Sequence, residues 1–156
     1  MAETYLAVKW LHIVSATLLF GTGLGTAFHF WHTCRGGNVD AIAAAARTTV
    51  VADFVFTLPA AIVQPVTGIA LAMLAGYPLG SRWIVAAIAL YAIAGACWIP
   101  VVFIQLRLRD LAAAHAREAS APGSEFNRLF RRWFILGWPA FISMLLILWL
   151  MVSRPS

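Results

Sequence analysis

The chain has 156 residues, of which 62% are hydrophobic and only 11% are charged. Because soluble globular domains carry about 25% charged residues, this composition and a mean hydropathy of +0.85 exclude an ordinary soluble protein and predict an integral membrane protein. The formal charge of +5 does not indicate nucleic-acid binding, since basic loops of membrane proteins record their orientation. Cys34 and Cys97 lie in different segments without CxxC spacing, so we expect two free thiols.

The first apolar run extends from Tyr5 to Trp31, about 27 residues, which is enough for a tilted helix to cross a bilayer. It is too long for a secretory signal peptide, and no small-residue cleavage pattern follows it. Its polar residues recur at steps of three, seven and four, which return to the same side of a helix: His12, Ser15, Thr22 and Thr26. A polar stripe inside a membrane must face something other than lipid.

The middle of this run contains three glycines, among them the pair Gly21 and Gly25. Small residues four positions apart let two membrane helices approach closely, so we expect a tight helix contact here. Close approach to a flat cofactor is the alternative. A soluble dinucleotide-binding loop is excluded, because the third glycine of that fingerprint is absent and no strand precedes it.

The second predicted helix extends from about Asp40, its expected N-cap, to residue 75. Pro59 and Pro65 each remove a backbone donor inside it, and a membrane tolerates such breaks only where neighbours satisfy the freed carbonyls. We expect the side chain of Gln64 to do so. Four polar residues spaced by four, seven and three again share one face: Asp53, Thr57, Gln64 and Thr67.

Two further helices complete the predicted fold. The third extends from about residue 81 to residue 116, and the fourth from about residue 124 to residue 152. Together with the first two, at about 5–33 and 40–75, they predict an all-α transmembrane four-helix bundle that forms a single domain over residues 1–156. One face of the third helix carries larger polar and aromatic residues: Tyr91, Trp98, Gln105 and Arg109.

Basic residues are distributed unevenly between the two ends of these helices. The turn after the first helix and the loop after the third helix lie on the same side of the membrane. With the helix ends next to them, they carry most of the arginines: Arg35, Arg47, Arg107, Arg109, Arg117, Arg128, Arg131 and Arg132. The opposite side has only Lys9, Arg82 and Arg154. By the positive-inside rule, this predicts a multi-pass membrane protein whose arginine-rich side faces the cytoplasm and whose two termini lie on the outer side.

His12 is the first candidate for chemistry. A neutral imidazole in a helical bundle is a common axial ligand of haem iron, and Ser15, Thr22, Thr26, the glycines and interior aromatics such as Trp98 would leave room for a flat ring. The alternative is a histidine that hydrogen-bonds a neighbour near the interface. We expect the other histidines to be solvated, with a second haem or metal site between them as the alternative: His29, His32 and His115.

Asp53 is the most costly residue of the chain if it faces apolar surroundings, because a carboxyl group there costs about 2.5 kcal/mol or more on insertion scales. We expect it to be protonated or paired with Gln105, Arg107 or Arg109 across the contact between the second and third helices. Two roles are possible for this carboxyl: a hydrogen bond or ion pair that specifies the packing of the bundle, or proton transfer. With Gln64, these residues form a predicted polar interior.

Four motifs resemble those of an uncharacterised bacterial family of four-helix integral membrane proteins: Lys9-Trp-Leu-His-Ile-Val, Phe20-Gly-Thr-Gly-Leu-Gly-Thr26, Gly95-Ala-Cys-Trp-Ile-Pro100 and Gln105-Leu-Arg-Leu-Arg-Asp110. The resemblance covers nearly the whole chain. That family is similar, more remotely, to the HemJ-type protoporphyrinogen oxidases and the CopD-like membrane domains, which share an early Leu-His dipeptide in the leading helix. In HemJ-type proteins the matching histidine is associated with b-type haem, and its position here is His12.

The chain departs from the HemJ-type pattern in the third helix, where those proteins use a lysine. Lys9 is the only lysine here, and the membrane part of the third helix contains no histidine. Haem b at His12 would therefore need another sixth ligand, an open position or a water. Met73 lies at a suitable predicted depth for that position.

The residues and the resemblance together support three hypotheses about function. The leading one is a b-type haem protein of the membrane, with His12 as the axial ligand, that works in electron transfer or a haem-linked oxidation and has a quinone or a porphyrin as partner. The second is a small transporter or channel subunit in which Asp53 and Gln64 line a path, completed by a homo-oligomer because four helices alone make a narrow path. The third is a membrane scaffold without chemistry.

Overall fold

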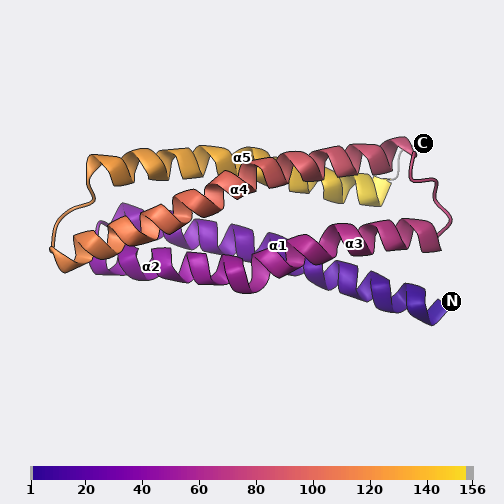
Figure 1. Cartoon of the computed structure of the whole chain (residues 1–156), viewed down its shortest axis with the longest axis horizontal. Coiled ribbons are helices and arrows are strands. Elements are labelled where there is room, and N and C mark those ends of the chain that lie inside the picture. The colour runs from indigo at the N-terminus through magenta and orange to yellow at the C-terminus, as the bar shows by residue number, and fades with distance from the viewer. Residues whose placement is uncertain (1, 154–156) are drawn as a thin grey trace.

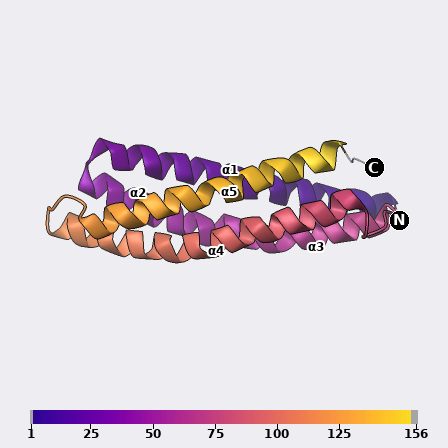
Figure 2. The same ribbon diagram turned by 90° about the horizontal axis from the view of Figure 1, so that it is seen from above.

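The computed structural model describes residues 2–153, and every regular element in that range is a helix. The helices lie lengthwise beside one another, and α1 begins at the end of the bundle at which α5 stops (Figure 1; Figure 2). The predicted all-α transmembrane bundle is therefore confirmed. Arg154, which was included in the count of basic residues above, lies outside the described residues. Four spans are long and apolar enough to cross a membrane: α1 (Ala2–Gly36), Val39–Leu74, α4 (Arg82–Arg117) and α5 (Ser124–Ser153).

The second span is not one continuous α-helix. It consists of α2 (Val39–Ala52), a π-helical turn η1 (Asp53–Thr57) and α3 (Leu58–Leu74). At the end of η1, the N–H of Leu58 donates to the carbonyl of Asp53, five residues earlier, as in a π-helix. The turn ends two residues before Pro59, whose missing N–H interrupts the α-helical ladder. The prolines alone predict a bend here, but not a π turn.

Pro65 leaves a second carbonyl without its usual donor, that of Ala61 four residues earlier. The hydroxyl group of Tyr91 on α4 donates to this carbonyl, with 2.5 Å between the two oxygen atoms. The prediction that Gln64 would satisfy the freed carbonyl is wrong, because its side-chain amide bonds residues of α1 instead. A neighbouring helix thus repairs the proline break, as the apolar surroundings require.

The N-terminus of α2 differs from the prediction. Its N-cap is Asn38, not Asp40, because Asn38 Oδ1 accepts a hydrogen bond from the backbone N–H of Ala41 at 2.9 Å. Asp40 lies in the first turn, where a negative charge interacts favourably with the helix dipole. Both residue types favour a helix start, and the extended backbone of Asn38 makes it the capping residue.

The helices pack in a chain of neighbours: α1 contacts α2 and α3, and α4 contacts α2 and α5. The hydrophobic core lies where the end of α1 meets α2, the end of α4 and the start of α5. Trp133 is buried in this core, edge-on to Phe30. Large side chains fill this core and alanines let the helices approach: Phe30, Ala45, Ala46, Leu108, Ala112 and Phe126.

Gly21 and Gly25 do not make the predicted close helix contact within this chain. A Cβ atom added at either position would meet no atom of a neighbouring element within 4 Å, and the same holds for Gly23. Other residues of α1 join it to the rest of the chain: Phe30 in the core, Phe20 stacked on Phe141 of α5, and His12 and Ser15 against α3.

The outer surface of the bundle is apolar along its length, with large hydrophobic side chains exposed on every span, such as Trp10, Ile62, Phe103 and Trp149. A soluble monomer rarely exposes contiguous apolar surface of this extent, whereas lipid tails are as apolar as these side chains. The chain is therefore a multi-pass integral membrane protein whose helices contact the lipid bilayer.

Truncation of Leu108 tests the assigned core. Leu108 is 0% exposed, so Leu108→Ala should lower the free energy of unfolding by about 2–5 kcal/mol through lost packing and a cavity. Leu145→Ala is the matched control, because Leu145 of α5 is 44% exposed and detergent or lipid can fill the space it leaves. Thermal unfolding in detergent micelles, followed by circular dichroism, measures both; equal losses would contradict the core.

Candidate functional site

A closed hydrogen-bonded cluster joins α1 to α3. His12 and Ser15 come from α1, Gln64 and Thr67 come from α3, and all four side chains are buried. His12 Nδ1 lies 2.8 Å from Thr67 Oγ1, and His12 Nε2 lies 3.2 Å from Gln64 Nε2. The hydroxyl of Ser15 donates to Gln64 Oε1. These four residues are termed the His12 cluster.

The surrounding atoms assign a tautomer to His12. The amide nitrogen of Gln64 can only donate, so ring Nε2 accepts and Nδ1 carries the proton. Nδ1–H then donates to Thr67 Oγ1, whose own proton goes to the backbone carbonyl of Val63 at 2.8 Å. Both ring nitrogens are therefore satisfied, and a neutral imidazole bridges two membrane helices.

Gly68 lets the imidazole lie this close to α3. A Cβ atom at position 68 would stand 3.2 Å from His12 Cε1, which is closer than side-chain carbons normally pack. The spacing of Gly68 in the sequence does not distinguish it from glycines such as Gly95, at which an added Cβ would have no neighbour within 4 Å. Its position one residue after Thr67 on the polar side of α3 was the only available sign.

The structure brings together only some of the residues predicted to surround a cofactor. His12 and Ser15 belong to the His12 cluster, whereas the hydroxyl of Thr26 donates to the carbonyl of Thr22 in its own helix at 2.8 Å. Trp98 lies on α4 and lines a pocket beside Asp53. The polar stripe of α1 therefore splits into an end that bonds α3 and a part that bonds its own backbone.

The His12 cluster can be compared with the needs of a haem ligand. An axial histidine binds iron through one ring nitrogen and donates a hydrogen bond from the other, and the Nδ1–H bond to Thr67 meets the second need. Nε2 accepts from Gln64, and iron would take the same lone pair. Haem at His12 would therefore require Gln64 to turn away. Met73, considered above as a sixth ligand, is largely exposed.

Asp53 opens the π turn η1 and is buried. Its Oδ1 accepts a hydrogen bond from the hydroxyl of Thr57 at 2.9 Å. The side chain of Gln105 on α4 also hydrogen-bonds this carboxyl, which agrees with one of the three partners expected from the sequence. Both partners are neutral, so the carboxyl is paired without a salt bridge to either of them.

The two arginines expected as partners of Asp53 bind other residues. Arg107 pairs with Glu125 at 3.0 Å, and Arg109 pairs with Asp110 at 2.8 Å. This part of the prediction is wrong because both guanidinium groups lie in partly exposed positions, where acidic neighbours are available and no charge has to be buried.

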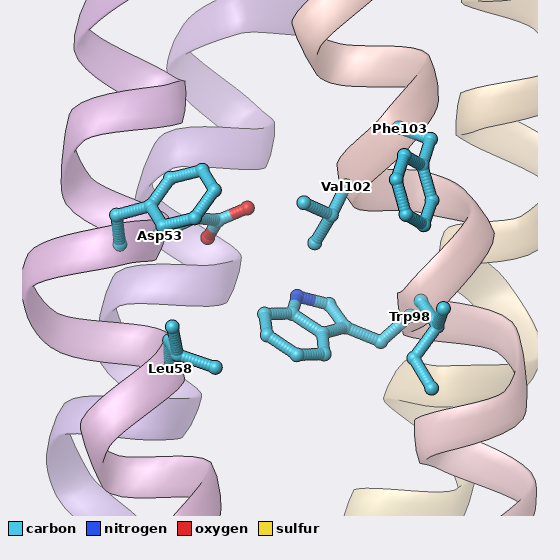
Figure 3. A pocket seen from close by; sticks show the side chains of 7 residues that line it. Asp53, Leu58, Trp98, Val102 and Phe103 are labelled. Carbon is cyan, nitrogen blue, oxygen red and sulfur yellow. The ribbon is translucent and has the colours of Figure 1, made fainter.

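A pocket of about 130 Å³ lies beside Asp53, between the second span and α4 (Figure 3). In Figure 3 the carboxyl group of Asp53 points towards α4, and the indole ring of Trp98 reaches from α4 into the same space. This cavity is termed the Asp53 pocket. Its remaining walls are apolar: Phe54, Leu58, Trp98, Ile99, Val102 and Phe103.

One face of the second span is polar and buried along most of its length, and each of its members is at most 6% exposed: Thr49, Asp53, Thr57, Gln64 and Thr67. The spacing in the sequence predicted all of them except Thr49, which lies four residues before Asp53 and fits the same period. Two buried atoms near its start have no hydrogen-bond partner in the described part of the chain, Thr49 Oγ1 and Gln105 Oε1. This face is termed the polar face.

The remaining histidines lie apart from these two sites. Among residues 2–153, no group of three or more His, Cys, Asp or Glu side chains is placed to hold a metal ion. His115 fastens the loop after α4: its Nδ1 lies 3.0 Å from Ser120 Oγ, and its Nε2 accepts from the N–H of Gly123 at 3.1 Å. His32 is exposed and stacks on Phe28.

Comparison with protein-family models matches residues 6–155 to a family described as predicted integral membrane protein (DUF2269). The chain belongs to this family. Comparison with curated proteins and with solved structures found no match. Membership of DUF2269 confirms the expected membrane family and agrees with the four spans, but the description names no reaction. The features of the chain that bear on function are the His12 cluster and the Asp53 pocket.

A double-mutant cycle tests the contact between His12 and Gln64. A hydrogen-bonded pair in a membrane protein contributes about 0.6 kcal/mol and at most about 1.7 kcal/mol, so His12→Ala and Gln64→Ala should be coupled by that amount in the free energy of unfolding in detergent. Thr33→Ala is the control partner, because Thr33 bonds its own helix at His29, about six turns further along α1. Its effect should add to that of His12→Ala; equal coupling in both cycles would contradict the contact.

Proposed function

We propose that this protein is a small proton-coupled transporter or channel subunit of the bacterial inner membrane. The observation that supports the proposal is the buried polar face of the second span, which carries Asp53 and Gln64 and meets the imidazole of His12. Ionisable residues inside membrane segments are rare and mark ion and proton pathways. Because each polar group adds a cost in the bilayer, a scaffold without chemistry would be more stable with fewer of them.

The His12 cluster can respond to a proton. Nε2 of the ring accepts from the Gln64 amide nitrogen at 3.2 Å. If Nε2 of His12 were protonated, its N–H and the amide N–H of Gln64 would be two donors facing each other. The amide of Gln64 would then have to rotate so that Oε1 accepts from Nε2–H. Ser15 would then accept a hydrogen bond from Gln64 instead of donating one. A proton at His12 thus reverses the two hydrogen bonds of Gln64 across the contact between α1 and α3, while the bond from Nδ1–H to Thr67 is kept.

Asp53 is the second proton-binding group in this proposal. It lies about 16 Å along the helix from Gln64 at about 1.5 Å per residue, so a proton cannot pass directly from one to the other. Thr57 lies between them on the polar face, and its hydroxyl already bonds the carboxyl. Both the charged and the neutral carboxyl can use Thr57 and Gln105 as partners, because a hydroxyl and an amide each donate and accept.

The proposal includes a homo-oligomer. Four helices make a narrow path, and further copies of the chain would complete it. In this proposal the arginine-rich ends face the cytoplasm and both termini face the periplasm, because the positive-inside rule applies to these short loops.

Proton flux into liposomes tests the transport function. Purified protein should carry protons down an imposed pH gradient, recorded by a pH-sensitive dye enclosed in the liposomes. Asp53→Asn should reduce the rate by about tenfold or more, since an amide of similar shape cannot release a proton. Asp40→Asn, in the exposed first turn of α2, should leave the rate unchanged. Wild-type liposomes no leakier than empty ones would overturn the proposal.

A b-type haem protein with His12 as an axial ligand is the second candidate. The supporting observation is the buried ring whose Nδ1–H is held by Thr67 at 2.8 Å, as in metal-binding histidines. When bound, the haem would supply one-electron chemistry. His12 would hold it, Thr67 would orient the ring, and Gln64 would have to leave Nε2. The remote resemblance to the HemJ-type proteins is a further support.

An absorption spectrum of the purified protein tests this candidate. Expression with added haem precursor should give a Soret band that disappears in His12→Ala. Gln64→Ala should keep or raise the haem content, because it frees Nε2, and Thr33→Ala should not change it. Colourless wild-type protein, or a Soret band that persists in His12→Ala, would exclude haem at His12.

A further inference from the structure

The Asp53 pocket sets one carboxyl group against otherwise largely apolar walls. Asp53 is 5% exposed, and Gln105, which lies beside Asp53 but not among the residues that line the pocket, is 6% exposed. Oε1 of Gln105 has no hydrogen-bond partner among the described residues, and a buried acceptor without a partner is costly. The body of the pocket is apolar on all its other walls. A ligand with an oxygen or a hydroxyl group at one end of an apolar ring would match this arrangement.

The pocket is accessible from the lipid. Three of its wall residues, Phe54, Ile99 and Phe103, are exposed on the outer surface of the chain, which faces the acyl tails. The pocket lies inside spans that are long and apolar enough to cross the membrane. A ligand would therefore enter sideways from the bilayer, and it has to be soluble there. Charged lipid head groups are excluded because they stay at the membrane surface.

The size of the pocket limits the ligand to a single ring. Its volume of about 130 Å³ is close to the roughly 150 Å³ of an apolar cavity that accommodates benzene, and a porphyrin is several times larger. The ring would meet the aromatic side chain of Trp98 (Figure 3), and aromatic pairs in offset or edge-on contact are favourable. A longer apolar tail would remain outside, among the lipid chains.

We infer that the Asp53 pocket binds the head group of an isoprenoid quinone or its quinol, with a ring oxygen at the Asp53 carboxyl. A protonated carboxyl donates to a quinone carbonyl, while an ionised carboxyl accepts from a quinol hydroxyl. The inference goes beyond the proposed transport function, because a ring bound at Asp53 requires neither proton flux nor haem.

Calorimetric titration tests the site on the full chain in lipid nanodiscs. The probes are a benzoquinone with one isoprenoid unit and its quinol, with empty nanodiscs as the reference for partitioning into lipid. The wild-type protein should show saturable binding. Val102→Phe, which fills the pocket, and Asp53→Asn, which replaces the carboxyl, should each weaken it by about tenfold or more.

Two control variants keep the test specific. Ile142→Phe adds the same kind of side chain on the lipid-facing side of α5, and Asp40→Asn removes a carboxylate at an exposed position; both should bind like the wild type. Binding no different from that of empty nanodiscs would overturn the inference. Equal affinity in the wild type and Val102→Phe, or in the wild type and Asp53→Asn, would also overturn it. Saturable binding by a protein that conducts no protons would refute transport alone.

Discussion

Water is absent from the interior of a bilayer, so every hydrogen-bonding group carried into it needs a partner from the protein itself. This constraint organises the second span. Its buried polar face bonds α1 through Gln64 and Thr67, and it bonds α4 through Asp53. Even the carbonyl freed by Pro65 finds a donor, the hydroxyl of Tyr91. Since lipid competes equally for apolar side chains, such polar contacts fix the positions of the helices more specifically than hydrophobic burial does.

The π turn connects this constraint to the two candidate sites. α2 packs against both α4 and α1, whereas α3 packs mainly against α1, so the polar face changes its main partner along the span. A π turn inserts one residue into the helical repeat and thereby rotates everything that follows. On one side of η1 the polar face presents Asp53 to Gln105, and on the other side it presents Gln64 to His12. π turns are frequent at functional sites, and here the turn begins with the buried carboxyl itself.

Periodicity in the sequence predicted most of the buried polar residues, although Thr22 and Thr26 are only half-buried, and it did not predict which residues meet. Hydropathy determines the four spans, and the steps of three, four and seven select His12, Ser15, Asp53, Gln64 and Thr67. Partners depend on the depth and rotation of separate helices, and these follow from contacts of about 1 kcal/mol each. For this reason Gln105 was identified as a partner of Asp53 while Arg107 and Arg109 were wrongly added. Gln64 was matched to a carbonyl that Tyr91 occupies.

The two sites differ in what can reach them. The His12 ring is enclosed by Gln64, Thr67 and the Cα of Gly68, so a proton can change its state while a larger ligand first has to displace Gln64. The Asp53 pocket lies beside exposed aromatic residues and is accessible from the lipid. A molecule dissolved in the bilayer would therefore meet Asp53 before His12. Asp53 and Gln64 belong to one helical face, so the geometry of both sites depends on the rotation that the π turn η1 gives to α3.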